Sequence, residues 1–232
     1  MAQAPIHHNG TLRYHAEALV AAGLCALPAI RRGDEKRVAL AKWKPYQERL
    51  PKTEELESWF SEHTDAICIV CGSVSGNLEM IDFDLGGEAF DAWKQAVNKQ
   101  MPGLLDRLVI ETTPSGGFHV VYRCDEAVSG NMKLASRVIR SDGPEPITIG
   151  AKDYTPHKSS NGQWQVTITM IETRGEGGLF LCDPSDGYKL IQGELVAPPT
   201  ITSDERDILL GCAWALDERP REIVGSNQRA AT

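Results

Sequence analysis

Leu78-Glu79-Met80-Ile81-Asp82-Phe83-Asp84 combines the apolar content of a strand with two acidic residues. Side chains two residues apart on a strand point to the same face, so Asp82 and Asp84 should lie together, with Cα atoms about 6.6 Å apart. Their charges repel unless a divalent cation neutralises them, and carboxylate oxygens favour Mg²⁺ or Mn²⁺. Taken alone, an Asp-x-Asp pair is more often the plain end of a strand, here followed by the turn Leu85-Gly86-Gly87.

Further strands and helices surround this segment in mixed order. The turn at residues 72–77 predicts a hairpin between residues 66–71 and 78–83. Residues 31–52 and 124–162 are predicted to be irregular, with a short hairpin near 147–151. The other predicted strands are 24–30, 108–112, 118–123, 164–172, 179–183 and 188–191, and the predicted helices are 11–22, 53–60, 88–100 and one that begins at 202. This order favours an α+β (mixed α/β) fold over a doubly wound parallel sheet.

The composition is that of an ordinary globular protein. The 232 residues are 41% apolar and 24% charged, which is enough to bury a real core. The net charge of −8 argues against a surface covered with phosphate contacts. Because no apolar run is long enough to span a bilayer and the first ten residues lack the pattern of a secretory signal, we expect a soluble, cytoplasmic protein with no membrane partner.

Basic residues are nevertheless concentrated in one stretch. Residues 31–52 contain eight Lys or Arg against three Asp or Glu, a local charge of +5. Arg37, Lys42 and Lys44 belong to this stretch. Such a run either meets a nucleic-acid backbone or a triphosphate, or simply faces water.

The six cysteines do not form a zinc-binding pattern. Cys68 and Cys71 have no second pair at a suitable spacing, so we expect no structural zinc site. Both lie in the apolar segment 66–71, where their three-residue offset predicts thiols on opposite faces of a buried strand.

Two later blocks add residues that suit phosphate and metal. In Pro114-Ser115-Gly116-Gly117-Phe118-His119, glycine N–H groups could cradle phosphate oxygens, and His119 should face away from its apolar neighbours. In Ile171-Glu172-Thr173-Arg174, the acid and the guanidinium should share a face, which strict alternation along 164–172 also assigns to Met170. Each block also has a plain interpretation: a tight hairpin with a partly buried histidine, and a structural salt bridge.

Read together and in this order, the blocks resemble the catalytic core of the archaeo-eukaryotic primase superfamily. The closest resemblance is to the bifunctional primase-polymerase (prim-pol) domain at the N-terminus of plasmid and phage replication proteins. That family's Asp-x-Asp strand after a Ser-Gly turn is matched by residues 75–84, and its Thr-Pro-Ser-Gly-Gly-x-His motif by Thr113 to His119. Its acidic strand followed by Arg-Gly and Gly-Gly is matched by Glu172 to Gly178, and the likeness runs from about Tyr14 to Pro199.

The resemblance implies roles for individual residues. It implies an α/β module packed on a sheet like that of the RNA-recognition motif, with the active site between them. The catalytic metal ligands would be Asp82, Asp84 and Glu172, which would hold two Mg²⁺ or Mn²⁺ ions. The contacts to the nucleotide triphosphate would be Ser115, Gly116, Gly117, His119 and Arg174. Arg37 maps approximately to the family's upstream basic residue, and Lys42 and Lys44 are further candidates for template or phosphate contact.

The implied function is template-dependent nucleotidyl transfer, as a DNA primase and DNA polymerase. Its partners would be a single-stranded DNA template with a primer and dNTPs or NTPs. Residues 1–200 would form the catalytic domain, and 201–232 would start a truncated C-terminal helical segment or linker that lacks packing partners, with a helicase domain or subunit beyond it. The alternatives are a nuclease, an Asp-x-Asp glycosyltransferase, or a non-catalytic nucleic-acid-binding module.

Overall fold

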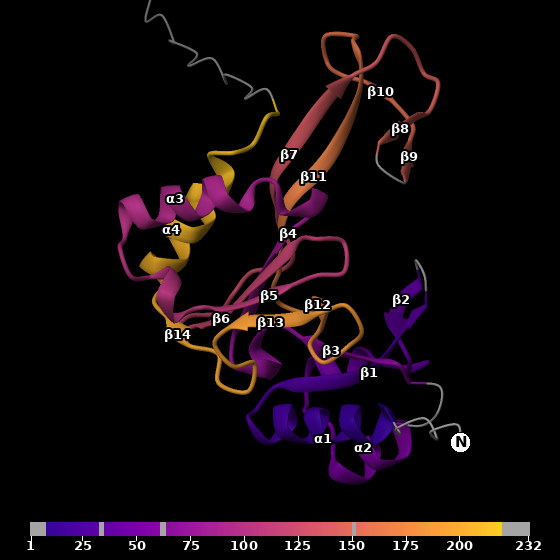
Figure 1. The fold of residues 1–232 in the computed structure, drawn as a ribbon, viewed down its shortest axis with the longest axis vertical. Coiled ribbons are helices and arrows are strands. Elements are labelled where there is room, and N and C mark those ends of the chain that lie inside the picture. Colours follow the sequence, from indigo (N-terminus) through magenta and orange to yellow (C-terminus); the bar gives the residue numbers. More distant parts are fainter. Residues whose placement is uncertain (1–7, 33–34, 61–63, 150–151, 220–232) are drawn as a thin grey trace, which may run out of the picture.

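The structure is a computed structural model that describes residues 8–32, 35–60, 64–149 and 152–219. It contains two main antiparallel sheets, each with helices on one face (Figure 1). The first sheet has the order β12-β3-β1-β2. Its strands are β1 (Cys25–Arg32), β2 (Glu35–Val38), β3 (Ala66–Val70) and β12 (Leu179–Cys182).

Burial on both sides explains the uniformly apolar sequence of β3. Helices α1 (His8–Ala21) and α2 (Thr53–Trp59) cover one face of the first sheet, and the chain around Tyr46 covers the other. Cys68 packs into one of these cores and Cys71 into the other, so the predicted opposite orientation of the two thiols is confirmed. Helix α1 begins three residues before the predicted start at residue 11.

The second sheet has the order β10-β11-β4-β6-β5-β13, with β7 also paired to β11 and β14 to β6. All pairings are antiparallel except that of β14 with β6. Helices α3 (Phe90–Gln100) and α4 (Ser203–Trp214) cover its outer face (Figure 1). The strands are β4 (Leu78–Phe83), β5 (Val109–Thr112), β6 (Phe118–Cys124), β7 (Lys133–Arg140), β10 (His157–Lys158), β11 (Trp164–Arg174), β13 (Lys189–Gln192) and β14 (Thr200–Ile201). Within the described residues, no helix is long and apolar enough to cross a membrane.

The predicted hairpin between residues 66–71 and 78–83 is wrong. Strand β3 pairs with β1 and β12, whereas β4 pairs with β6 and β11 in the other sheet. A 3-10 turn, η2 (Ser73–Ser75), and the positive φ angles of Gly72 and Gly76 redirect the chain between the two strands. The segment therefore connects the sheets instead of closing one of them.

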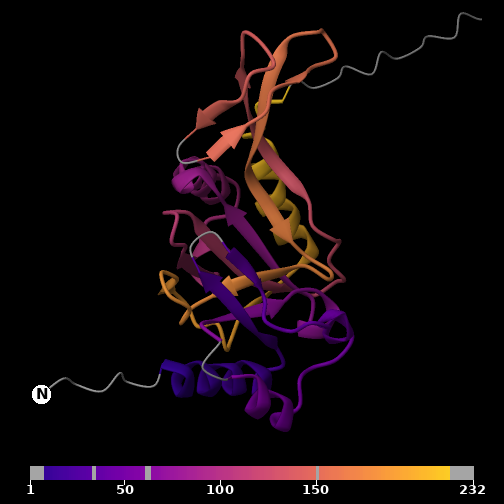
Figure 2. The ribbon, with the colours of Figure 1, turned by 90° about the vertical axis from the view of Figure 1, so that its right-hand side faces the viewer.

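Both segments predicted to be irregular contain strands. In residues 31–52, β2 pairs with β1, and a 3-10 turn, η1 (Lys44–Gln47), follows. In residues 124–162, β7 pairs along β11, and the two strands project together from the body of the molecule (Figures 1 and 2). The short predicted hairpin is present as β8 (Ile147–Ile149) and β9 (Lys152–Tyr154), although its tip lies outside the described residues. Strand β7 was missed because its partner lies far along the chain.

Helix α4 is packed into the core, so the expectation that it lacks packing partners is wrong. Its Leu209 and Leu210 are buried against α3, and the Trp93 indole N–H donates to the Leu209 carbonyl at 2.9 Å. The predicted capping box at Thr202 is confirmed. Whether a separate segment starts at residue 201 stays a prediction, and residues 220–232 lie outside the described part.

A buried ion pair joins α4 to the outer face of β4. Arg206 donates to both carboxylate oxygens of Glu79, at 2.6 and 2.8 Å, and the Tyr122 hydroxyl donates to the same carboxylate at 2.7 Å. Glu79 is fully buried, so its charge depends on these partners.

We predict that Arg206→Ala lowers the free energy of unfolding by about 3 to 5 kcal/mol, because it leaves the Glu79 charge buried and unpaired. Urea unfolding measures the loss. The control is Arg107→Ala, which removes an arginine whose pair with Glu205 is partly exposed and should cost less than about 1 kcal/mol. Equal losses in the two variants would contradict the prediction.

Candidate active site

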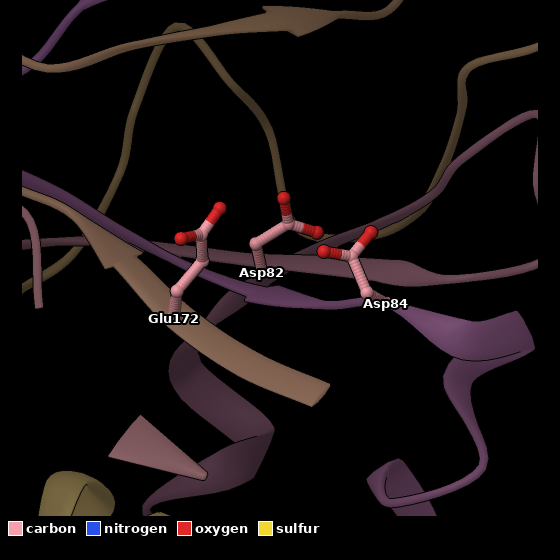
Figure 3. A group of neighbouring side chains, drawn as sticks. All are labelled: Asp82, Asp84 and Glu172. Carbon is pink, nitrogen blue, oxygen red and sulfur yellow. The ribbon is translucent and has the colours of Figure 1, made fainter. Parts of the chain in front are cut away.

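Three carboxylates meet where β4 lies beside β11. Asp82 on β4 stands directly opposite Glu172 on β11, and Asp84 follows the end of β4. Each residue places a carboxylate oxygen within 4.8 Å of those of the other two. Figure 3 shows the three carboxylates rising from the sheet toward the same side. The predicted grouping of these three acids is therefore present in the fold.

A β-bulge in β11 turns Glu172 toward this side. Thr169 stands opposite Ser136 and Ile171 opposite Ala135, so Met170 is an extra residue on β11. Met170 and Ile171 consequently both pack into the core beneath α3 and α4. Strict alternation placed Glu172 on the same face as Met170, and that prediction is wrong because the bulge shifts the alternation by one residue.

Two glycine turns touch beside the acids. The backbone after Asp84 is left-handed at Leu85, Gly86 and Gly87, with φ of 54°, 67° and 72°. A Cβ on Gly117 would lie 2.2 Å from the Phe83 carbonyl oxygen, so only glycine allows this close approach. The glycine of the second motif thus holds the strand of His119 against the strand of the two aspartates.

The same turn uses its own N–H groups. The Gly116 N–H donates to the Thr113 carbonyl at 2.9 Å, and the Gly117 N–H donates to the Thr113 hydroxyl at 3.1 Å. Ser115 is exposed, with its hydroxyl 3.1 Å from that of Thr113. Ser115 consequently offers an exposed hydroxyl at this turn, whereas both glycine N–H groups are used within it.

His119 faces the acids, as its alternation with apolar neighbours predicts. Its Nε2 lies 3.7 Å from Asp82 Oδ1, and its Nδ1 lies 2.7 Å from Glu111 Oε1. The ring is almost fully buried. Arg174 lies on the same face and forms an ion pair with Glu172, which confirms the predicted shared face.

The environment of Asp82 makes its charge costly. The pKa of Asp82 is raised to about 6, chiefly by burial; the carboxylates of Asp84 and Glu172 also raise it, while His119 and Arg174 lower it. A carboxylate in this setting gains from a cation that neutralises the cluster. Three oxygen donors at this spacing fit a divalent metal ion.

A cleft of about 440 Å³ opens beside the acids, between the two sheets. Its lining combines polar and charged groups of both sheets with aromatic walls. The lining includes Lys36, Trp43, Asp82, His119, Asn131, Arg174, Phe180 and Tyr188. Sequence reasoning missed Lys36, Asn131 and Tyr188, and it also missed Glu111 behind His119. Only Lys36 carried a signal, since it lies in the basic stretch.

The three basic residues selected from that stretch lie outside the cleft lining. Arg37 pairs with Glu35 at 2.6 Å, and Lys42 and Lys44 are exposed. Lys36 precedes Arg37 on β2, so its side chain leaves the strand on the other face. It stands opposite Arg31 in the β1–β2 ladder, and the Arg31 guanidinium lies over the ring of Tyr188.

The sequence matches the family described as bifunctional DNA primase/polymerase, N-terminal, over residues 16–221. The chain belongs to this family. A comparison with curated proteins yields no match. The primase/polymerase match contains all three acids, the glycine turn with His119, and Arg174. It also contains α4, in agreement with the packing of that helix on the core.

Family membership supports a nucleotidyltransferase enzyme whose substrates are nucleic acid and nucleotides. The acid cluster fits the divalent metal site that such chemistry needs. The observed fold, two antiparallel sheets with helices and a cleft between the sheets, agrees with the α+β catalytic core expected from the sequence.

We predict that Asp82→Asn stabilises the metal-free protein near pH 7 but not near pH 4. The pKa of Asp82 is about 6 in the fold, against an ordinary value of 3.8, so its ionisation destabilises the fold progressively as pH rises from about 4 to 6. The gain above pH 6 should reach up to about 3 kcal/mol.

Urea unfolding in EDTA at the two pH values measures this difference. Asp91→Asn is the control, because Asp91 is an exposed aspartate on α3 and should show no comparable gain at neutral pH. A gain from Asp82→Asn that is the same at both pH values would contradict the prediction.

Proposed function

We propose that this domain catalyses template-dependent nucleotidyl transfer, as a DNA primase and DNA polymerase. The reaction joins the 3′-hydroxyl of a primer or initiating nucleotide to the α-phosphate of a bound nucleotide and releases pyrophosphate. The observation that supports it best is the cluster of Asp82, Asp84 and Glu172 at the edge of a cleft with basic side chains. Family membership supplies the reaction class.

Asp82, Asp84 and Glu172 would hold two Mg²⁺ or Mn²⁺ ions. When bound, these ions supply Lewis-acid chemistry that activates the attacking hydroxyl and offsets charge on the leaving group. Ionisation of all three carboxylates is unfavourable without a cation, since they repel one another and Asp82 is poorly solvated. A divalent ion held among these carboxylates would relieve the repulsion, whereas a triphosphate without a metal ion would increase it. The cluster thus favours nucleotide that arrives with a divalent ion.

The cleft would hold the triphosphate between basic groups of both sheets. Arg174 offers a planar guanidinium, which suits phosphate oxygens, and His119 Nε2 opens toward the same space. Lys36 reaches the cleft from the first sheet, and we propose it for the upstream basic role in place of Arg37. The Ser115 hydroxyl, at the exposed turn held by Gly116 and Gly117, would complete the contacts. These groups would position the phosphates rather than transfer protons.

The remaining basic residues suit a template. These are Arg37 on β2, Lys42 between β2 and η1, and Lys44 at the start of η1; all three are exposed and lie outside the cleft lining. Phosphate contacts there would be local, which reconciles DNA binding with the net charge of −8.

We predict that Asp82→Ala combined with Asp84→Ala abolishes nucleotide incorporation on a primed single-stranded DNA template, because it removes two of the three metal ligands. The assay uses a 5′-labelled primer with Mg²⁺ or Mn²⁺, and offers dNTPs and NTPs separately. Lengthened primer indicates a polymerase, and shortened primer indicates a nuclease.

The matched control removes two exposed aspartates from α3 and α4, Asp91→Ala with Asp207→Ala, and should retain activity. Circular dichroism checks that both double variants are folded. Incorporation by a folded Asp82→Ala and Asp84→Ala variant would overturn the proposed mechanism.

We also predict that Lys36→Ala raises the KM for the incoming nucleotide by about tenfold, whereas Arg37→Ala changes it little. The loss of one charged hydrogen bond, worth roughly 1.5 kcal/mol, sets this magnitude. Steady-state incorporation at varied nucleotide concentration separates the two, and the adjacent residues make each variant the control of the other. A larger effect on nucleotide KM from Arg37→Ala would contradict the assignment of Lys36.

A further inference from the structure

Glu111 is a fully buried acid next to the candidate active site. It lies outside the three sequence motifs that predicted the site. It lies on β5, directly opposite His119 on β6, and its side chain has no exposed surface. An ionised carboxylate at such a depth is costly unless its oxygens accept hydrogen bonds. Its partners therefore indicate what the acid is for.

Each oxygen of Glu111 faces one partner. Oε1 lies 2.7 Å from His119 Nδ1, and Oε2 accepts the Asp183 backbone N–H at 3.0 Å. Among the described residues these are the hydrogen-bond partners of this side chain. An ionised carboxylate only accepts hydrogen bonds, so beside ionised Glu111 the His119 Nδ1 carries a proton and donates it.

The rest of the pocket holds the ring in this orientation. The Phe180 ring meets the imidazole edge-on at 5.5 Å, and the Tyr188 ring lies at 5.7 Å. With Nδ1 directed at Glu111, Nε2 is directed at the cleft, where Asp82 Oδ1 lies 3.7 Å away. The hydrogen bond at one nitrogen of an imidazole thus decides what the other nitrogen offers.

We propose that Glu111 is a positioning residue that acts through His119: it accepts the hydrogen bond from Nδ1–H and so directs Nε2 at the nucleotide triphosphate. Because phosphate oxygens also only accept hydrogen bonds, the ring makes this contact with both nitrogens protonated, a state that the Glu111 carboxylate stabilises. The inference rests on the proposed function for what the ring contacts. The hold of Glu111 on the ring follows from the geometry alone.

The fixed N–H of Asp183 makes a sharp test available. In Glu111→Gln, the amide oxygen must face the Asp183 N–H to keep that bond, which places the amide NH₂ against His119 Nδ1. An NH₂ group donates, so Nδ1 would have to lose its proton and the ring would carry it on Nε2. The substitution keeps the shape of the side chain but replaces the hydrogen-bond acceptor that faces Nδ1 with a donor.

The direct measurement is the ¹⁵N NMR pattern of the imidazole in protein labelled at histidine, without nucleotide or metal, with His119→Ala to identify the signals. We expect a protonated Nδ1 in the unsubstituted protein and an unprotonated Nδ1 in Glu111→Gln. The spectrum of the unsubstituted protein alone tests the proposal. An unprotonated Nδ1 in that protein would overturn it even if the variant failed to fold.

A binding cycle tests the consequence for nucleotide. Dissociation constants for dATP with Mg²⁺ are measured for the unsubstituted protein, Glu111→Gln, His119→Ala and the double variant. We expect Glu111→Gln to weaken binding about tenfold to a hundredfold, the range for substitutions behind a metal-ligating histidine, because a ring whose Nδ1 faces an NH₂ group is confined to its neutral form. In the His119→Ala background the same substitution should cost nothing more, and Glu194→Gln, at an exposed glutamate, should cost nothing in either.

The outcomes separate the two proposals. If Glu111→Gln weakens binding equally with and without His119, Glu111 does not act through the ring, and the inference is wrong. Unchanged ring signals with normal dATP binding overturn the role of Glu111 alone. If the unsubstituted protein fails to bind dATP with Mg²⁺, the proposed function fails, and with it the purpose assigned to the ring.

Discussion

The site depends on the register of β4 between its two neighbours. Asp82 stands opposite His119 on one side and opposite Glu172 on the other, and His119 in turn stands opposite Glu111. Four strands thus carry one row of ionisable side chains across a single face of the sheet. A slip of one residue in either pairing would turn part of the row into the core. The register of the strand pairs therefore also sets the geometry of the site.

Strand β4 carries an acid on each face, and the fully buried Glu79 and the partly buried Asp82 have different surroundings. On the outer face, the charge of Glu79 is offset within the protein by Arg206 and Tyr122, which attach α4 to the sheet. On the cleft face, Asp82 has two further acids nearby and a histidine whose Nε2 lies 3.7 Å away, and its pKa is raised. The charge of Glu79 is neutralised within the protein, whereas the negative charge around Asp82 is left for a bound cation to offset.

Close packing of glycine turns sets how near the two motifs come. Gly117 lies against the Phe83 carbonyl, and a Cβ on Gly87 would lie 2.5 Å from the Phe118 ring. Side chains at these positions would force apart the strands that carry Asp82 and His119. These glycines therefore contribute chiefly by the close contact that they allow, since the N–H groups of Gly116 and Gly117 are used within their own turn.

The sequence by itself determined the local features: the shared face of Asp82 and Asp84, the burial of segment 66–71, helix α3, and the hairpin of β5 and β6. These features follow from side-chain periods of two or 3.6 residues, which neighbouring residues set. Only the tertiary structure decided that β3 and β4 belong to different sheets, that β7 lies along β11, and that a bulge turns Glu172 toward the cleft. It also brought Lys36 and Glu111 to the site. Strand partners and bulges depend on contacts between residues far apart in the chain, which no local pattern records.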